Sequence, residues 1–126
     1  MNMGKRNILI VEDEFITALD IKMRLTTHGY NAFDNVGTGE EAIKIVENEK
    51  VDLILMDIKL KGKIDGIEAA QIINKKYNIP IIYMSGNTDM HKSDRLKATN
   101  PAGIIGKPIM EYELFETINN ALNNTD

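Results

Sequence analysis

The chain has 126 residues, of which 43% are hydrophobic and 27% charged, and its formal net charge is −4. This size and composition are typical of one globular domain with one hydrophobic core, and they exclude two domains of ordinary size. An acidic chain has no basic surplus for a phosphate backbone, so direct nucleic-acid binding is not expected, and a chain without cysteine forms neither disulfides nor thiolate zinc sites.

The apolar runs of the chain are short. None approaches the roughly 20 residues of a membrane helix, and the run that follows Lys5 and Arg6 stops at Glu12, too early for a signal peptide. We therefore expect a cytoplasmic protein without membrane insertion. The expected boundaries are one domain over 1–126, a core over about 6–122, and flexible ends at 1–5 and 123–126.

Five short runs predict β-strands. Continuous apolar runs are typical of strands covered on both faces, whereas alternating apolar and polar residues are typical of an edge strand. In chain order the runs are Ile8–Val11, the alternating Ala32–Val36, Leu53–Met56, Ile81–Met84 and Gly103–Ile105.

The segments between these runs have the apolar spacing of helices. It is clearest over 15–26 and 114–122. Thr38 or Gly39 is expected to start the second helix, and the pair at 28–29 to stop the first. Strand and helix alternate five times, which predicts a parallel sheet with helices on both faces, because parallel neighbours need long crossovers.

Polar side chains follow the predicted strands at the sheet edge where open α/β sheets bind ligands. Glu12 and Asp13 follow the first strand, Asp57 the third, Ser85 the fourth and Lys107 the fifth. Three carboxylates in one place repel each other unless a cation or a proton intervenes, and oxygen ligands with this charge suit Mg²⁺ before Ca²⁺. A carboxylate can also attack a phosphoryl group, whose charge a metal, an ammonium and a hydroxyl can share.

The chain resembles the receiver domain of two-component response regulators over almost its whole length. Each of the motifs that carry the resemblance is weak singly, but together and in this order they are specific. They are Val11-Glu12-Asp13-Glu14, Leu55-Met56-Asp57, Asp65-Gly66, Ile81-Ile82-Tyr83-Met84-Ser85-Gly86 and Lys107-Pro108. The resemblance implies a flavodoxin-like, doubly wound, five-stranded parallel sheet of order 2-1-3-4-5 with five helices.

The resemblance also implies a phosphorylation site. Asp57 would accept a phosphoryl group from the phosphohistidine of a sensor histidine kinase. Ser85 matches the family's switch hydroxyl and Lys107 its phosphate-binding lysine, whose bond to Pro108 is typically cis in the family. The chain would then catalyse only its own phosphorylation and dephosphorylation, and it is not expected to be an enzyme in the ordinary sense.

The implied cofactor is Mg²⁺. By the same resemblance, Asp13, Asp57 and the backbone carbonyl of Lys59 would ligate the ion directly, and Glu12 would act through water.

The resemblance says less about which protein responds to phosphorylation than about which protein donates the phosphoryl group. An output protein or a fused output domain would receive the signal, and the sequence does not say whether this chain acts alone or belongs to a larger regulator. In the family the responding surface usually includes the fourth helix, fifth strand and fifth helix, here roughly 88–122, and a homodimer through that face is compatible with the resemblance.

Three positions depart from the family pattern. Ile104 stands where an aromatic residue often reports phosphorylation, so the usual aromatic readout is not expected. The loop over 59–66 has three lysines, lacks the proline that is common after the phosphorylation site in the family, and is one residue longer than usual. In this it resembles a receiver subgroup with the pattern Asp-Ile-x-Leu-x-Gly-x-x-Asp-Gly. Lys59 and Asn87 occupy variable positions that tune hydrolysis in the family, and they do not predict the lifetime of the phosphorylated state.

Other interpretations of the same residues stay open at this stage. Glu12 and Asp13 are also suited to capping the following helix. A phosphohydrolase of the haloacid dehalogenase type shares the nucleophile and Mg²⁺, but it resembles Asp-x-Asp where this chain has Asp57-Ile58-Lys59. A flavin or nucleotide binder of the same fold needs a phosphate loop of small residues after the first strand, where this chain has Glu12-Asp13-Glu14. A receiver that is never phosphorylated would have no need of Glu12, Asp13, Asp57, Ser85 and Lys107, which are all present.

Overall fold

The computed structural model describes residues 5–86 and 93–123, and five strands alternate with five helices in this part of the chain. Several predicted features lie outside the described residues: the ends at 1–4 and 124–126, Asn87, and the part of the expected responding surface over 88–92. The elements are β1 (Asn7–Val11), α1 (Phe15–Thr27), β2 (Asn31–Ala32), α2 (Gly39–Asn48), β3 (Leu53–Asp57), α3 (Gly66–Lys76), β4 (Ile81–Ser85), α4 (Asp94–Ala98), β5 (Gly103–Gly106) and α5 (Glu111–Asn123).

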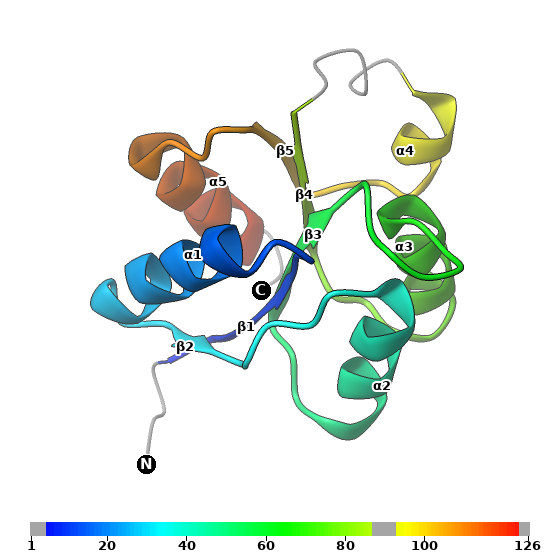
Figure 1. Ribbon diagram of the computed structural model, residues 1–126, viewed down its shortest axis with the longest axis horizontal. Coiled ribbons are helices and arrows are strands. Elements are labelled where there is room, and N and C mark those ends of the chain that lie inside the picture. The colour runs from blue at the N-terminus through cyan, green and yellow to red at the C-terminus, as the bar shows by residue number, and fades with distance from the viewer. Residues whose placement is uncertain (1–4, 87–92, 124–126) are drawn as a thin grey trace.

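The strands form one parallel sheet in the order β2-β1-β3-β4-β5. Helices α1 and α5 cover one face, and α2, α3 and α4 cover the other (Figure 1). The predicted fold class, strand order and number of helices are therefore confirmed. None of the helices in the described ranges is long and apolar enough to cross a membrane.

The three central strands are apolar on both faces because helices bury both faces. Along β1, Leu9 and Val11 belong to the core beneath α2 and α3, whereas Ile8 and Ile10 belong to the core beneath α1 and α5. Successive side chains of a strand point to opposite faces, so a strand between two helical layers needs an uninterrupted apolar run. This requirement makes the continuous runs of the sequence reliable markers of the central strands.

The edge strand β2 is shorter than its sequence pattern predicts. Only Asn31–Ala32 pair with β1, and the predicted extent of Ala32–Val36 was wrong. The chain leaves the ladder at Asp34, which turns to solvent and pairs with Lys22 at 2.7 Å, and it returns for a single bridge between Val36 and β1. Alternation of apolar and polar residues continues through the gap, so the pattern does not reveal the interruption.

The helix ends follow their capping residues. Thr38 caps α2 by accepting a hydrogen bond from the Glu41 amide at 3.1 Å. Helix α1 ends at Thr27 with His28 as its C-cap, and the next residue, Gly29, has a left-handed φ of 88°. Glu14 is the N-cap residue of α1 and makes no side-chain capping bond, whereas Glu12, which precedes it, accepts a hydrogen bond from the Glu14 amide at 3.1 Å. At the other terminus, α5 includes Asn123, which the sequence had assigned to a flexible end.

Helix α3 begins directly against the backbone of β3. Asp65 and Glu68 form a capping box, and the Gly66 amide donates to the Ile58 carbonyl at 2.8 Å. A Cβ atom at Gly66 would lie 2.2 Å from the Asp57 carbonyl oxygen, which is backbone and cannot turn aside. Only glycine therefore allows α3 to start this close to the end of β3.

We expect Gly66→Ala to lower the free energy of unfolding by about 2–3 kcal/mol, because overpacking against fixed backbone forces α3 or β3 to move. Urea denaturation followed by circular dichroism measures the change. Gly106→Ala is the matched control, since a Cβ atom there meets nothing within 4 Å. Equal stability of the Gly66→Ala and wild-type proteins would contradict the close approach.

Candidate functional site

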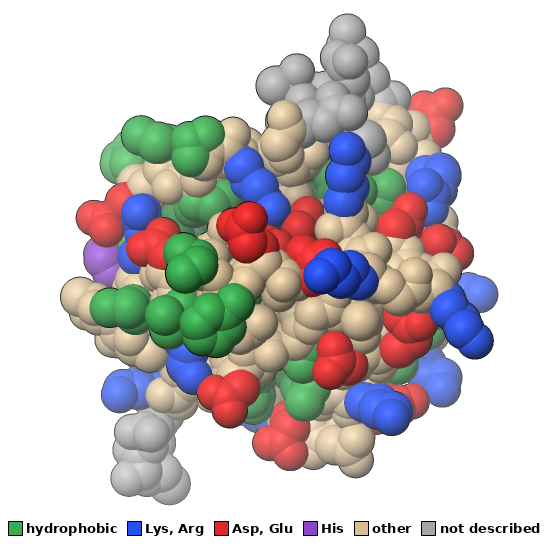
Figure 2. Space-filling model, viewed as in Figure 1, with side chains coloured by type: hydrophobic (Ala, Val, Ile, Leu, Met, Phe, Trp, Pro, Cys, Tyr) green, Lys and Arg blue, Asp and Glu red, His purple; other side chains and the backbone are tan. Residues whose placement is uncertain are grey.

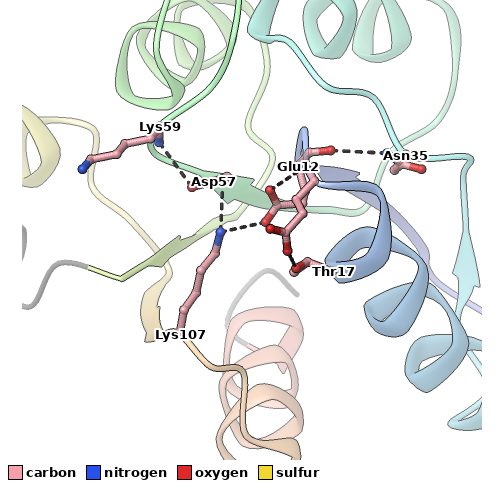
Figure 3. A network of polar contacts seen from close by, with 7 residues as sticks. Glu12, Thr17, Asn35, Asp57, Lys59 and Lys107 are labelled. Carbon is pink, nitrogen blue, oxygen red and sulfur yellow. Dashed lines mark hydrogen bonds and ion pairs between the residues drawn. The ribbon is translucent and has the colours of Figure 1, made fainter.

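Charged side chains from three separate strand ends meet at one edge of the sheet. Glu12 follows β1, Asp57 ends β3 and Lys107 follows β5. The Lys107 Nζ atom lies 2.7 Å from Glu12 Oε1 and 3.1 Å from Asp57 Oδ2, so one ammonium bridges the two carboxylates (Figure 3). The parallel sheet thus brings together residues that are up to 95 positions apart in the chain.

Both bridged carboxylates are buried, and each of their oxygens has a donor. Glu12 is 1% exposed and Asp57 is 6% exposed. The second oxygen of Glu12 accepts from the Glu14 amide at 3.1 Å, and the second oxygen of Asp57 accepts from the Lys59 amide at 3.2 Å. Burying a carboxylate is costly unless charge and hydrogen bonds compensate, and here the lysine and two backbone amides supply both.

The ammonium of Lys107 is held in its charged form. Burial acts to lower its pKa, but the hydrogen bonds and negative charges of Glu12 and Asp57 outweigh burial, and the pKa is raised above its usual value. Lys107 is therefore a permanent positive charge next to Asp57 at neutral pH.

The acidic residues outnumber this positive charge. Glu12, Asp13 and Asp57 each offer one carboxylate oxygen, and these oxygens lie within 4.8 Å of one another. Three carboxylates with one ammonium leave a formal excess of about two negative charges, which a divalent cation would balance. The donors are all oxygen, as Mg²⁺ prefers, and Asp13 is the least buried of the three.

Ser85 and Lys59 are the other two residues that the sequence predicts for this site. Ser85 ends β4 and is buried, and its carbonyl accepts from the Lys107 amide at 2.9 Å, which fixes the end of β5 next to the end of β4. The bond between Lys107 and Pro108 is cis, as the resemblance predicted. Lys59 places its amide on Asp57, while its side chain extends away from the carboxylates (Figure 3).

One contributor to the site gave no signal in the sequence. The Asn35 side chain donates to the Glu12 backbone carbonyl at 3.3 Å, and the Glu12 amide donates to the Val36 carbonyl at 2.9 Å. The segment that follows β2 therefore fixes the backbone from which Glu12 projects (Figure 3). Asparagine in a short alternating run has no pattern that predicts this contact.

Comparison with known proteins agrees with this geometry. The response regulator receiver domain family matches residues 8–119, so the chain belongs to this family. A signal receiver domain of a modulated diguanylate cyclase from Desulfovibrio desulfuricans G20 is 31% identical, with a TM-score of 0.88 and 96% of each chain covered. The N-terminal domain of a response regulator/sensory box/GGDEF 3-domain protein from Carboxydothermus hydrogenoformans is 30% identical, with a TM-score of 0.87 over 95% of this chain and 96% of that one.

Longer regulators match as well. The transcriptional regulatory protein PdtaR of Mycobacterium tuberculosis is 30% identical over 118 residues, which are 94% of this chain and 57% of PdtaR. The phyllosphere-induced regulator PhyR of Methylorubrum extorquens is 30% identical over 116 residues, which are 91% of this chain and 43% of PhyR. The chain thus spans about half the length of these relatives.

Proposed function

We propose that this receiver domain is the phosphoacceptor of a phosphorelay and that Asp57 accepts a phosphoryl group from the phosphohistidine of a sensor histidine kinase. The observation that carries the proposal is the 3.1 Å contact between Asp57 Oδ2 and the Lys107 ammonium inside an acidic cluster at the sheet edge. In the transfer, an oxygen of Asp57 bonds to phosphorus while the bond between phosphorus and the imidazole nitrogen breaks, and its electron pair returns to the imidazole.

The residues around Asp57 are suited to stabilise that transfer. Lys107 lies where its charge can balance the negative charge on the transferred oxygens, and Ser85 ends the neighbouring strand with a hydroxyl that can donate to them. The Lys59 amide holds one Asp57 oxygen, which leaves the carboxylate in a fixed orientation.

Mg²⁺ is the proposed cofactor, held by Asp13, Asp57 and the Lys59 carbonyl, with Glu12 acting through water. The different burial of the three carboxylates supports this assignment, because Glu12 is the most buried at 1% exposed, Asp57 is 6% exposed and Asp13 is the least buried. When bound, the ion would neutralise charge on the phosphoryl oxygens.

The exposed side of α1 is suited to contact the phosphodonor. Phe15, Ile16, Leu19 and Met23 are all exposed, with Ile16 at 72%, and they gather in one apolar patch, the α1 patch (Figure 2). A groove of about 540 Å³ lies beside the patch and includes Ile16 and Lys107 in its lining. A kinase that brings phosphohistidine to Asp57 must cover this edge of the sheet, and an apolar patch of this kind is typical of an interaction surface.

The contacts disfavour the phosphohydrolase alternative. Such an enzyme needs an acid two positions after its nucleophile to protonate the leaving group, and here the position holds Lys59, whose exposed side chain extends away from Asp57 (Figure 3). The proposed chemistry is therefore limited to the phosphorylation and dephosphorylation of the domain itself. A cytoplasmic location, the absence of direct nucleic-acid binding, and output through a separate protein or a fused domain are also part of it.

Incubation with acetyl phosphate and Mg²⁺ should add the mass of one phosphoryl group to the intact wild-type protein and none to Asp57→Asn. Replacing one carboxylate oxygen by an amide nitrogen removes the nucleophile with little change in shape. Intact-protein mass spectrometry decides the question, and hydroxylamine, which cleaves acyl phosphates, should remove the label. No mass gain in wild type, or an equal gain in Asp57→Asn, would refute the assignment.

Asp13→Ala should weaken Mg²⁺ binding about tenfold or more, and by a larger factor than Glu12→Gln, because a direct ligand is lost in the first case and a water-mediated one in the second. Isothermal titration calorimetry with MgCl₂ gives the affinities. Glu47→Gln, an exposed acid on α2, serves as the control for general loss of negative charge. The reverse order of the two site variants would show the ligand assignment to be wrong.

The double variant Ile16→Ser and Leu19→Ser should slow transfer from a kinase that labels the wild type by about tenfold, since it removes apolar area from the α1 patch. Labelling by acetyl phosphate should stay unchanged, because a small donor needs no docking surface. Ile72→Ser, on α3, is the matched control for removing an exposed apolar side chain. An equal loss with both donors would assign the effect to the site itself and not to docking.

A further inference from the structure

A second surface feature, separate from the phosphoacceptor site, lies between the end of α1 and α5. It is a cleft of about 450 Å³. We call it the α5 cleft, and its lining residues are His28, Glu111, Tyr112, Phe115, Glu116 and Asn119.

Aromatic rings form much of the α5 cleft. The His28 ring stacks on Phe115 with 3.7 Å between ring centroids and 18° between planes. Tyr112 is 78% exposed, and its hydroxyl donates to Glu116 at 2.7 Å, one turn further along α5. The hydrogen bond fixes the direction of the Tyr112 ring, so an exposed aromatic face is held in place at the cleft.

The lining of the cleft includes two glutamates, Glu111 and Glu116, and neither lysine nor arginine. Helix α5 carries Glu111, Glu113 and Glu116, and the sequence from 108 to 126 contains neither lysine nor arginine. The basic residue of α1 nearest in sequence to His28, Arg24, is already engaged with Asp20 at 3.2 Å and with a backbone carbonyl at 3.5 Å. The cleft therefore combines exposed aromatic rings with carboxylates that have no basic partner on their own helix.

We propose that the α5 cleft binds an arginine side chain from a segment of a partner protein. A guanidinium is flat, so it can stack on Tyr112 while its N–H groups donate to the carboxylates of Glu111 and Glu116. Lysine fits less well, because its ammonium is a strongly hydrated point charge that cannot stack. The assignment is independent of the proposed phosphorylation, since no residue of the cleft contacts Asp57 through the hydrogen bonds and ion pairs found in the described part of the chain.

A simple acidic helix face would also attract basic peptides, and Glu113 distinguishes the two cases. It is exposed on the same helix but does not line the cleft. If the cleft recognises arginine, the position of the carboxylate matters. If only net charge matters, all three glutamates of α5 are equivalent.

The test uses a blocked heptapeptide, Gly-Ser-Leu-Arg-Leu-Ser-Gly, and a twin with citrulline in place of arginine, which keeps the shape and removes the charge. Titration into the full ¹⁵N-labelled chain, followed by NMR, should show saturable shifts at the cleft residues. Binding should be about fivefold weaker for the citrulline twin and for the double variant Glu111→Gln and Glu116→Gln. Tyr112→Leu should weaken it too, whereas Glu113→Gln and Asp57→Asn should not.

Three results would overturn the proposal. Equal binding of the two peptides would remove the role of the guanidinium charge, and an effect of Glu113→Gln as large as that of the cleft variants would reduce the binding to general electrostatics. The third is a dimer in sedimentation equilibrium that dissociates in the cleft variants, which would assign the cleft to a second copy of this chain. The substituted side chains of α5 are exposed, and circular dichroism of every variant, including Asp57→Asn, verifies folding.

Discussion

The bridge from Lys107 to Glu12 and Asp57 is the interaction on which the carboxyl edge of this domain depends. Two almost fully buried carboxylates at the ends of adjacent strands would repel each other, and the ammonium between them offsets the repulsion. The bridge works only if β1, β3 and β5 stop at the same level. Parallel register guarantees this, and the short backbone bonds of Glu12 to Val36 and of Lys107 to Ser85 keep each strand end in place.

The same bridge bears on the proposed binding of a divalent cation. One ammonium cannot balance three carboxylates, so the site keeps an excess of negative charge that favours a divalent ion. The Lys107 ammonium thus stabilises the buried carboxylates, but the negative charge of the cluster is only partly neutralised. A fully neutral cluster would lack the excess negative charge that favours a divalent ion.

Sequence patterns predicted the central strands and the position of the charged residues at the sheet edge, because each has a strong physical cause. A strand covered on both faces must be apolar throughout, and a polar residue directly after such a strand must lie at the sheet edge. The patterns failed where the cause was local geometry or a contact distant in sequence. Alternation did not show that β2 stops at Ala32, and nothing near Asn35 indicated its bond to Glu12. The Asp65-Gly66 pair is one of the motifs of the family resemblance, but the reason for the glycine is its close contact with the Asp57 backbone, which no local sequence pattern predicts.

Exposed apolar side chains are distributed unevenly between the two helical layers. Within the described ranges, six of the seven exposed large ones lie on α1 or at the start of α5, and the seventh is Ile72 on α3. Stable homodimers usually bury an apolar core. A homodimer through α4, β5 and α5 would therefore rely mainly on polar contacts in the described part of that face, where Met110 and Tyr112 are the exposed large apolar side chains.

Helix α4 makes polar contacts with the rest of the domain at both of its ends. The contact at its C-terminal end involves Tyr83, the strand neighbour of Ile104. Ile104 pairs in register with Tyr83, so the buried aromatic ring lies one strand away from the position where the family often has one. The Tyr83 hydroxyl lies 2.7 Å from the Thr99 hydroxyl at the end of α4, and burial raises the Tyr83 pKa, which keeps the hydroxyl neutral.

At its other end, α4 is tied to the start of α3. Arg95 donates to both oxygens of Asp65 at 3.2 Å. Asp65 caps the helix whose first residue, Gly66, packs on the backbone of Asp57. The described contacts therefore lead from Asp57 to α4 through backbone packing and an ion pair. Displacement of α4 would break a buried hydrogen bond worth about 1 kcal/mol at one end and a half-exposed ion pair worth less at the other. Of these two polar attachments the ion pair is the weaker and lies nearer to Asp57, whereas Leu96, in the middle of α4, is fully buried and anchors the helix in the core.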